Sequence, residues 1–294
     1  MNRPLAVVVV AYNSPDALHA ALQPVQQVFR TIVVDNSSSP QVAAACGSGV
    51  EYLDPGRNLG FGAAVNLALG ALDVFATAGY DVLLLNPDAQ INPDIIRELQ
   101  NALFLQDNVG AVAPRQVSPG SRTEQRVAWP FPSPARAWFE AVGLGGQLLH
   151  RHDFLTGSVL LLSGQAVREV GGFDETFFLY AEETDWQRRA ADAGWRRVLQ
   201  DDLLATHVGG GTSSDESHRE RLFHAGQETY IRKWFGSSGW ASYRTAVIIG
   251  CLIRYLANPG SERPAIARRL RLYLIGPKRA LASNPGAKEG GQRA

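Results

Sequence analysis

Acidic and amide side chains follow directly where a hydrophobic run of this chain stops. Asn86 and Asp88 flank a proline after the apolar run 81–85, and an acidic cluster at 182–185 follows a group of aromatic residues. A carboxylate can help to hold a divalent cation, and a carboxylate can also act as a general base. Both roles require structural elements that bring these acids to one place.

Strand-like and helix-like segments alternate through the first third of the chain. Residues 6–13, 31–38, 50–56 and 81–88 begin as apolar runs and end in polar residues, whereas 14–25, 61–79 and 92–106 have helical character. Ser14 is the expected cap of the first helix, with Pro15 at its first position. This alternation predicts an α/β fold with a mostly parallel sheet and helices on both faces.

The polar residues at the strand ends are expected to converge, because ligands of such sheets bind beyond the carboxyl ends of the strands. Turns between strands and helices are commonly built from the same residue types, so a single strand end means little. Three such ends favour a shared crevice. The residues at them are Tyr12, Asn13, Asp35, Asn36, Ser37, Asn86 and Asp88.

A glycine-rich entry to a helix spans 56–66. Gly60 and Gly62 would let the backbone approach a ligand, and a helix N-terminus offers N–H groups to phosphate. The segment matches neither the dinucleotide fingerprint nor the phosphate-loop pattern. Taken alone, it is better explained as an ordinary helix start.

Helical spacing separates the acids of the cluster at 182–185. Asp185 lies three and four residues before Arg188 and Arg189, where a helical ion pair forms readily. Glu183 has only Gln187 four residues on and points nearly opposite to Asp185. We therefore predict Glu183 as the functional carboxylate, with Asp185 as the next candidate.

Composition suits a globular protein of a reducing compartment. The 294 residues are 45% hydrophobic and 19% charged, and the two cysteines are too few for a disulfide framework. The apolar run at the N-terminus is predicted to be a strand rather than a signal peptide, and no stretch is long enough to span a membrane. Residues 117–138, rich in proline, serine and arginine, are expected to form either a loop or lid over a site or a disordered insertion.

The C-terminal part is basic, with twelve Lys or Arg against two acids from residue 232 onward, and the preceding residues carry a balancing negative excess. Helices formed by this basic segment could lie on the surface of an anionic membrane. Aromatic residues suit the boundary between lipid and water, and this segment contains Trp234, Trp240, Tyr243 and Tyr255. The alternative is a helical appendage, with Ile248, Leu252 and Leu256 packed on the main domain or on a second subunit. No recognised nucleic-acid-binding module accompanies the charge.

The motifs together resemble the family 2 inverting glycosyltransferases, most closely their rhamnosyltransferase branch. The segments that carry the resemblance lie between about residues 5 and 215 and read VVVAYNSPDAL, IVVDNSS, NLGFGAAVN, LLLNPDAQINPD, FLTGSVLLLSGQAVREVGGFDETFFLYAEETDWQRRAADAGW and ATHVGGGTS. The resemblance implies a GT-A-type glycosyltransferase domain over 1–215, followed by a basic amphipathic helical extension over 216–294.

The resemblance also implies roles for single residues. Asp88 takes the place of the acid that binds a divalent cation, Mg²⁺ or Mn²⁺, on the donor diphosphate, although Asn86 stands where many relatives have Asp. His207 would join the metal or the diphosphate, whereas the residues alone leave a structural role open. Glu183 falls on the position of the catalytic base. Asp35 would accept the N3–H of a uracil or thymine ring, and the other donor-binding residues would be Ala11, Tyr12, Asn13, Asn58, Gly60, Phe61, Asn66 and Asn86.

The implied activity is transfer of L-rhamnose from dTDP-L-rhamnose to a glycan or a polyprenyl-diphosphate-linked saccharide, with inversion. The alternatives are a UDP-hexose or furanose donor, or a relative that binds nucleotide sugars or glycans without catalysis. The acids Asp35, Asp88 and Glu183 argue against the non-catalytic alternative. We expect a cytoplasmic protein, peripherally associated with the inner face of the plasma membrane, and leave a homodimer open.

Overall fold

The structure, a computed structural model, describes residues 3–121, 123–148, 152–209, 216–257 and 260–283. The chain forms two compact units. The first comprises residues 1–129, 152–178 and 182–214, and the second comprises 130–151, 179–181 and 215–294. The extension expected from residue 216 lies within the second unit, which also takes in two segments from the middle of the chain. The glycines at 210 and 211 behind His207, and the last eleven residues of the basic tail, lie outside the described residues.

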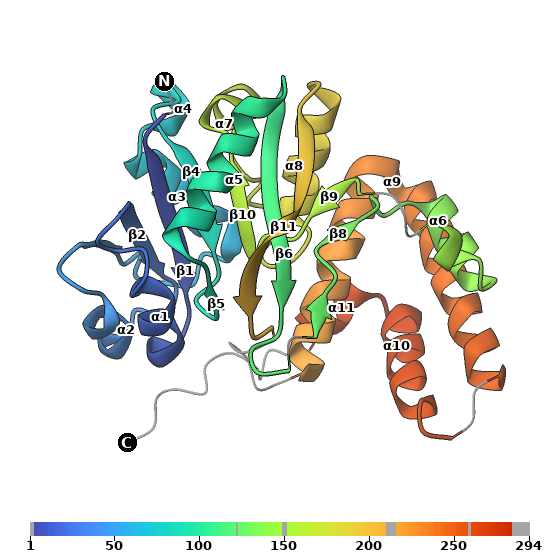
Figure 1. The fold of residues 1–294 in the computed structure, drawn as a ribbon. Helices are drawn as coiled ribbons and strands as arrows, with labels where there is room; N and C mark the ends of the chain where they lie inside the picture. Colours follow the sequence, from blue (N-terminus) through green and yellow to red (C-terminus); the bar gives the residue numbers. More distant parts are fainter. Residues whose placement is uncertain (1–2, 122, 149–151, 210–215, 258–259, 284–294) are drawn as a thin grey trace, which may run out of the picture. The chain divides into compact units, whose positions relative to one another are not determined.

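The first unit contains a nine-stranded sheet in the order β3-β2-β1-β4-β10-β6-β11-β5, with β7 paired to β6 (Figure 1). Four parallel strands form one half of it, as the sequence predicts: β1 (Leu5–Ala11), β2 (Arg30–Asp35), β3 (Val50–Leu53) and β4 (Asp81–Leu85). The other half is mixed, because β10 (Val159–Leu162) runs antiparallel to both of its neighbours, β4 and β6 (Val109–Val117). The remaining strands are β5 (Ala89–Gln90), β7 (Glu124–Gln125) and β11 (Arg196–His207).

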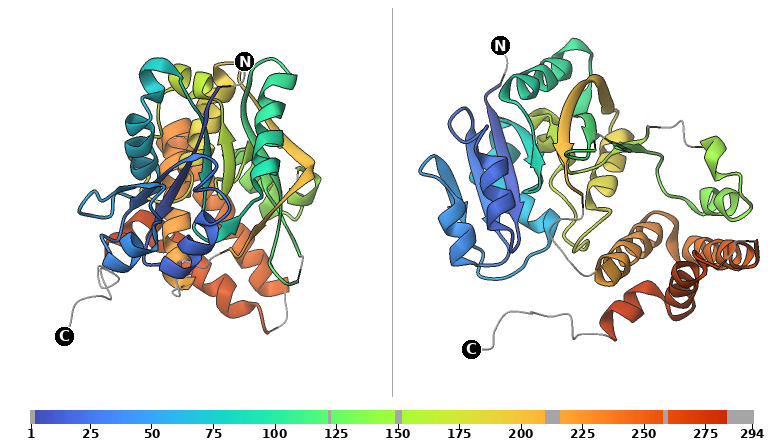
Figure 2. Two further views of the ribbon diagram at one scale, coloured as in Figure 1. Left: turned by 60° about the vertical axis from the view of Figure 1, so that its left-hand side comes forward. Right: turned by 60° about the horizontal axis from the view of Figure 1, so that its bottom comes forward.

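Helices cover both faces of this sheet (Figure 2), as predicted. Alternating side chains of the strands supply the two cores: Ala6 and Val8 face one cluster, while Val7 and Val9 face the other. The first cluster packs against α3 (Phe61–Ala71), α7 (Gly164–Val170) and α8 (Glu182–Asp192). The second packs against α1 (Pro15–Leu22), α2 (Pro40–Ala45) and α5 (Pro93–Leu105), and the short α4 (Val74–Thr77) follows α3.

Helix starts follow the capping residues only in part. Asn92 caps α5, since its side chain accepts a hydrogen bond from the N–H of Asp94 at 2.8 Å. Ser14 stands at the N-cap of α1 as expected, but its hydroxyl donates to the carbonyl of Tyr12 and caps no helical N–H. Pro15 alone, with its preset φ, marks that helix start.

The segment 117–138 is neither a featureless loop nor a disordered insertion in its described residues. It contributes β7, the strand β8 (Ala128–Trp129), which pairs with β9 (Phe154–Leu155), and the start of α6 (Pro134–Ala141). The prolines mislead because Pro134 occupies the first turn of α6 behind the capping residue Ser133, where proline is favourable.

The second unit is helical. It contains α6, the 3₁₀ turn η1 (Gly145–Leu148), the long helix α9 (Glu216–Ala257), α10 (Arg263–Ile275) and α11 (Pro277–Ala282). The path of α9 is broken at Gly236, whose φ of 67° is not helical. None of the helices in the described ranges combines the length and the apolar character needed to cross a bilayer.

Aromatic side chains form the core of the second unit. Trp240 stacks on Tyr243, and the hydroxyl of Tyr273 lies 3.0 Å from Nδ1 of His224. Burial lowers the pKa of His224 to about 3. Trp240 is buried, so the expectation that it lies at a membrane boundary is wrong. The sequence does not distinguish a core tryptophan from one at an interface, because both stand among apolar neighbours.

Candidate active site

Three polar strand ends meet at one edge of the sheet in the first unit. Strand β1 lies between β2 and β4, and all three are parallel. Ala11 pairs with Asp35 in register, and its carbonyl accepts a hydrogen bond from the N–H of Asn36 at 2.9 Å. The residues after β4 therefore leave the sheet beside those after β1 and β2, and the predicted convergence is confirmed.

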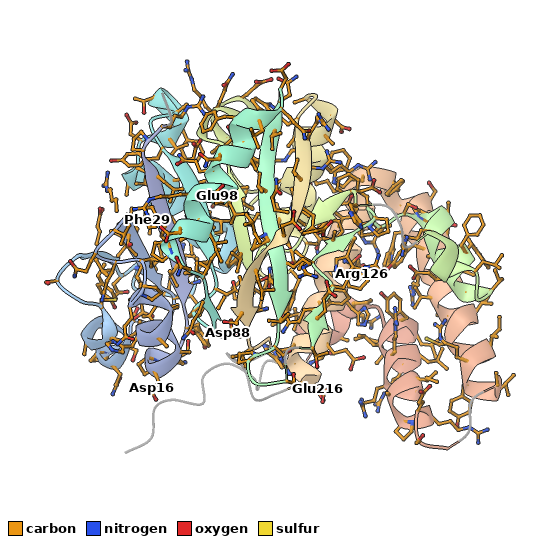
Figure 3. The ribbon with its side chains drawn as sticks, viewed as in Figure 1. Asp16, Phe29, Asp88, Glu98, Arg126 and Glu216 are labelled. Carbon is orange, nitrogen blue, oxygen red and sulfur yellow. The ribbon has the colours of Figure 1, made fainter. Side chains whose placement is uncertain are left out.

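Asp88 and His207 face each other at this edge. A turn after β4, closed by the N–H of Ala89 on the carbonyl of Asn86, leads into β5, which pairs with the end of β11 so that Ala89 is opposite His207. Nε2 of His207 lies 3.3 Å from Oδ1 of Asp88 and 3.4 Å from Nδ2 of Asn86. Both side chains are largely covered, and Figure 3 labels Asp88 at the end of the strands.

Gln125 holds the other side of the His207 ring. Its amide nitrogen donates to the carbonyl of His207 and to the hydroxyl of Ser118, which leaves Oε1 to accept from Nδ1–H of His207 at 3.0 Å. A neutral ring held in this tautomer points the Nε2 lone pair at the Asp88 carboxylate. Two acceptors so close together need a proton or a metal ion between them.

The Asp88–His207 pair fits a divalent cation that takes its remaining ligands from phosphate and water. Mg²⁺ and similar cations are commonly held by one or two protein carboxylates together with substrate phosphates. Among the described residues, no group of three or more His, Cys, Asp or Glu side chains could hold a metal without such help. A nucleotide diphosphate would supply the missing oxygen ligands.

Asp35 is completely buried, and its carboxylate is fully engaged within the protein. Oδ1 accepts from the N–H and the hydroxyl of Ser37, and Oδ2 accepts from the N–H of Ser39 and the hydroxyl of Tyr52. Burial first, and then the bond to Asp35, raises the pKa of Tyr52, so this hydroxyl remains a donor. A pyrimidine N3–H could reach Asp35 only by replacing one of these donors, and the hydroxyl of Ser37 can rotate away.

The loop after β1 is tied to the same serine. Tyr12 is partly exposed at the strand end, and Asn13 adopts a left-handed backbone with φ of 48°. The N–H of Asn13 donates to the Ser37 hydroxyl at 3.2 Å. Ser37 thus stands between Asp35 and the predicted base-binding residues Tyr12 and Asn13.

The glycine-rich entry to α3 satisfies its own backbone. Gly60 has a φ of 83°, and a side chain there would collide with the carbonyl of Phe178. The N–H of Gly60 donates to Oδ1 of Asn58, and the N–H of Phe61 donates to the Phe178 carbonyl. Because these donors are already used, the contacts favour an ordinary helix start over a phosphate cradle.

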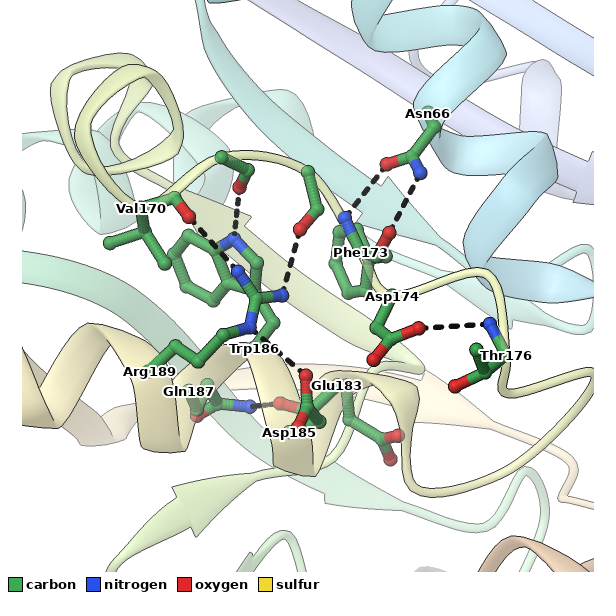
Figure 4. A network of polar contacts seen from close by, with 12 residues as sticks. Asn66, Val170, Phe173, Asp174, Thr176, Glu183, Asp185, Trp186, Gln187 and Arg189 are labelled. Atoms are coloured by element: carbon green, nitrogen blue, oxygen red, sulfur yellow. Dashed lines mark hydrogen bonds and ion pairs between the residues drawn. The ribbon is translucent and has the colours of Figure 1, made fainter. Parts of the chain in front are cut away.

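Asn66 is engaged in the same manner. Its side chain exchanges two hydrogen bonds with the backbone of Phe173 (Figure 4) and donates a third to the carboxylate of Glu175. These contacts anchor the loop 173–175 on α3. They account for Asn66 without a donor sugar, although the resemblance places it among donor-binding residues.

Asp185 forms the helical ion pair that its spacing predicts. Its Oδ2 lies 3.0 Å from Nε of Arg189, and the same guanidinium donates to the carbonyls of Val170 and Gly172 (Figure 4). Trp186 adds a bond from its indole N–H to the carbonyl of Gly171. Asp185 is completely buried in this network, so its contacts are those of a residue that holds α8 on the turn after α7.

Glu183 extends away from the Asp185–Arg189 pair (Figure 4). The residue is only partly covered, but its Oε2 is buried and has no hydrogen-bond partner among the described residues. A Cβ placed on Gly157 would lie 3.6 Å from Cγ of Glu183, so the turn before β10 borders this side chain. Burial raises the pKa of the Glu183 carboxyl, against the opposing effect of nearby N–H groups.

Glu182, which sequence reasoning did not single out, lies on the other side of this helix start. It is buried next to Gly62 of α3. Burial, followed by the charge of Glu183, raises its pKa well above that of an ordinary glutamate. The charge of Glu183 thus disfavours ionisation of the adjacent Glu182 carboxyl.

Comparison with known proteins gives the family. Residues 6–157 match the family described as Glycosyl transferase family 2, and residues 82–273 match Glycosyl transferase family group 2. This chain belongs to glycosyl transferase family 2. The N-acetylglucosaminyl-diphospho-decaprenol L-rhamnosyltransferase of Mycobacterium tuberculosis is 30% identical to it over 271 residues, which cover 82% of this chain and 87% of that protein.

Another relative of this family 2 glycosyltransferase matches a smaller part of the chain. A low-salt glycan biosynthesis hexosyltransferase of Haloferax volcanii is 29% identical over 194 residues, and the match spans 63% of this chain and 61% of that protein. Two solved structures share the GT-A-type fold. One is a mannosyltransferase of Pyrobaculum calidifontis in complex with GDP-Man and Mn²⁺, with a TM-score of 0.50 and 15% identity over 98% of this chain and 77% of that chain. The other is S. aureus TarS, with a TM-score of 0.52 and 14% identity over 98% of this chain and 93% of that chain.

The positioning roles of several residues at the site of this glycosyltransferase were not predicted from the sequence, although Asn36 was placed at one of the converging strand ends. Asn36 holds the glycine-rich loop, since its side chain bonds the carbonyl of Gly60 and the N–H of Leu59. Gln125 orients His207, and Tyr52 bonds Asp35. Only Asn36 had a signal in the sequence, namely its place at a strand end. The contacts of Gln125 and Tyr52 join segments that are distant in sequence, and no local pattern indicates them.

Proposed function

We propose that this protein is a metal-dependent inverting glycosyltransferase that transfers L-rhamnose from dTDP-L-rhamnose to a glycan or polyprenyl-diphosphate-linked saccharide. The observation that carries the proposal is the Asp88–His207 pair at the carboxyl edge of the sheet, at 3.3 Å. The choice of sugar is supported by the 30% identity to the mycobacterial rhamnosyltransferase.

Asp88 and His207 would hold Mg²⁺ or Mn²⁺ on the donor diphosphate. When bound, the cation would supply Lewis-acid stabilisation of the negative charge on the departing diphosphate. Asn86, whose amide faces His207, would complete this side of the donor site. The mannosyltransferase of similar fold, which is in complex with GDP-Man and Mn²⁺, makes a divalent cation a reasonable expectation here.

Glu183 would be the general base. Its carboxylate takes the proton of the acceptor hydroxyl while that oxygen bonds to the anomeric carbon and the bond from this carbon to the diphosphate oxygen breaks. The charge goes to the nucleotide diphosphate, and attack from the opposite face inverts the configuration. An environment that raises the pKa of Glu183 suits this role, because a stronger base accepts the proton more readily.

Asp35 would recognise the base of the donor together with Tyr12 and Asn13. Its four internal hydrogen bonds imply that the Ser37 hydroxyl gives way to the pyrimidine N3–H. The residues Ala11, Asn58, Gly60 and Phe61 would shape the backbone around the donor.

The experiment is a turnover assay with a panel of nucleotide sugars, with and without Mn²⁺. We expect rapid cation-dependent transfer from dTDP-L-rhamnose. Faster transfer from a UDP-hexose would favour a hexosyltransferase, which the identity to the Haloferax protein supports as second candidate. Binding of every donor without transfer to any acceptor would instead favour the non-catalytic alternative.

The second unit would dock the protein on the inner face of the plasma membrane, where a lipid-linked acceptor is reached. Leu252 and Leu256, near the end of α9, are 45% and 80% exposed, and Arg254 lies between them in sequence. Arg263 stands over the ring of Tyr255 close by. Apolar side chains flanked by cations suit an anionic bilayer.

Docking is tested by sedimentation of the full chain with phosphatidylglycerol vesicles. The double variant Leu252→Ser and Leu256→Ser should stay in solution, while Leu105→Ser, which changes a leucine of the first unit that is 77% exposed, should sediment like the wild type. Rising salt should release the wild type, since ions screen each cation's contribution of about 1 kcal/mol. Equal sedimentation of all three proteins would exclude this surface.

A further inference from the structure

A short β-ribbon contacts residues from both chemical groups of the site. We use the name ribbon for residues 124–129 and 153–157, which all belong to the first unit. Ala128 pairs with Leu155 and Trp129 with Phe154. The N–H of Thr156 donates to the carbonyl of Val127 at 2.9 Å and extends the pairing toward Gly157.

The first strand of the ribbon holds His207. Gln125 bonds Nδ1 of the ring through Oε1 at 3.0 Å and the carbonyl of the same residue through Nε2 at 2.6 Å. Its amide nitrogen also donates to Ser118. The bonds of the amide nitrogen to the His207 carbonyl and to Ser118 fix the place of Oε1, and a flip of the ring would break its bond to this oxygen, so Nε2 remains directed at Asp88.

The second strand of the ribbon holds α8 at Glu183. Gln187 is completely buried, and its amide pairs with both backbone groups of Leu155, accepting from the N–H at 2.8 Å and donating to the carbonyl at 2.7 Å. The side chain thereby imitates a third strand along the ribbon. Two residues further on, Gly157 borders Glu183, and the Gln187 amide also bonds the Glu183 carbonyl at 3.2 Å.

We propose that Gln125 and Gln187 are positioning residues that, through this one ribbon, set the places of His207 and Glu183 with respect to each other. The inference rests on the proposed function, in which the diphosphate and the base act on opposite faces of one sugar. Transfer in such a site depends on spacing, since a misplacement of about 1 Å can cost ~10²-fold in rate.

The two glutamines are expected to affect different steps. Gln125→Leu should weaken Mn²⁺-dependent binding of a pyrimidine nucleoside diphosphate by about 10–100-fold, the usual cost of losing a residue that orients a metal ligand. Binding without Mn²⁺ should be unchanged. The neighbouring exposed residue provides the control, and Glu124→Gln should bind like the wild type.

Gln187→Leu should lower kcat by about 10–100-fold at unchanged nucleotide-diphosphate affinity. The change removes the contacts that position Glu183 and does not alter the contacts of His207 and Asp88. The Leu155 backbone groups lose their partners in this variant, so Gln187→Asn, which keeps an amide but is too short to bridge both groups, is measured beside it. The same kcat loss in a variant whose thermal unfolding shows it to be folded supports positioning.

Isothermal titration calorimetry of dTDP with and without Mn²⁺, followed by steady-state kinetics, provides these readouts. Unchanged Mn²⁺-dependent affinity in Gln125→Leu, or a Gln187 variant that loses affinity but keeps its kcat, would overturn the inference. A wild type whose dTDP affinity does not respond to Mn²⁺ would instead count against the proposed function itself. The two failures are thus distinguishable.

Discussion

His207 presents Nε2 to Oδ1 of Asp88 at 3.3 Å, although the two residues stand at the ends of different strands. The short pairing of β5 with β11 brings them together, and Gln125 fixes the far side of the ring. A carboxylate and a ring nitrogen arranged in this way could supply two ligands of a coordination sphere, which a bound diphosphate and water would complete.

Asp88→Ala should abolish transfer and remove the effect of Mn²⁺ on nucleotide-diphosphate binding, because the carboxylate ligand is lost. Calorimetric titration of dTDP in both conditions measures this. Asp94→Ala, which alters an exposed acid paired with Arg97 on α5, is the control and should behave like the wild type. A normal response to Mn²⁺ in Asp88→Ala would exclude Asp88 as a ligand.

Asp35→Ala should weaken thymidine and uridine nucleotides far more than inorganic diphosphate. Asp35 also holds Ser37, Ser39 and Tyr52 by hydrogen bonds, so its loss could weaken binding indirectly. A second variant is needed to separate this indirect effect from a direct contact with the base. If Asp35 accepts the base N3–H in place of Ser37, Ser37→Ala should bind these nucleotides as well as the wild type. If Ser37→Ala instead lost about fivefold in nucleotide affinity, equivalent to a hydrogen bond of ~1 kcal/mol, Ser37 itself would contact the base.

Asp185→Asn should reduce stability rather than chemistry. The change removes a charge-assisted bond to Arg189 in a buried network and should lower the free energy of unfolding by about 1.5–3 kcal/mol. Urea unfolding measures this loss, and kcat per folded enzyme should stay close to that of the wild type. A stable but inactive Asp185→Asn would transfer the role of base from Glu183 to Asp185.

Glu182→Gln should stabilise the fold at neutral pH. The folded-state pKa of Glu182 is raised by burial and by Glu183, so the folded protein binds more protons than the unfolded chain above the ordinary glutamate pKa of about 4.3. Stability of the wild type therefore falls as pH rises from there through the raised pKa. Thermal unfolding should show a gain for Glu182→Gln near pH 7 that disappears near pH 4, and a gain of equal size at both values would contradict this linkage.

The sequence predicted those parts of the molecule that depend on local pattern. The parallel strands with their helices followed from alternation, the convergence of the strand ends followed from the sheet geometry, and the Asp185–Arg189 pair followed from helical spacing. The meeting of Asp88 and His207 was implied only by the family resemblance, since nothing local connects the two residues.

The residues that sequence reasoning missed act through contacts between distant segments. Gln187 appeared only as a neutral neighbour of Glu183, because its bonds go to the backbone of Leu155. Gln125 lay in a segment whose prolines suggested a loop, and one of those prolines instead begins α6. The burial of Glu182 depends on the approach of Gly62, which helical spacing alone does not reveal.

The central claim, catalysis by Glu183, is tested most directly by turnover of Glu183→Gln with dTDP-L-rhamnose, with Glu169→Gln, an exposed acid of α7, as control. If Glu183 is the base, its raised pKa makes the wild-type rate fall with decreasing pH at a higher pH than an ordinary glutamate would. Rates are therefore compared above this pH range, where the wild-type rate no longer changes with pH. We predict that Glu183→Gln binds the donor like the wild type and loses ~10²–10⁴-fold in kcat, while the control keeps its rate. A Glu183→Gln enzyme that retains wild-type kcat would contradict the account.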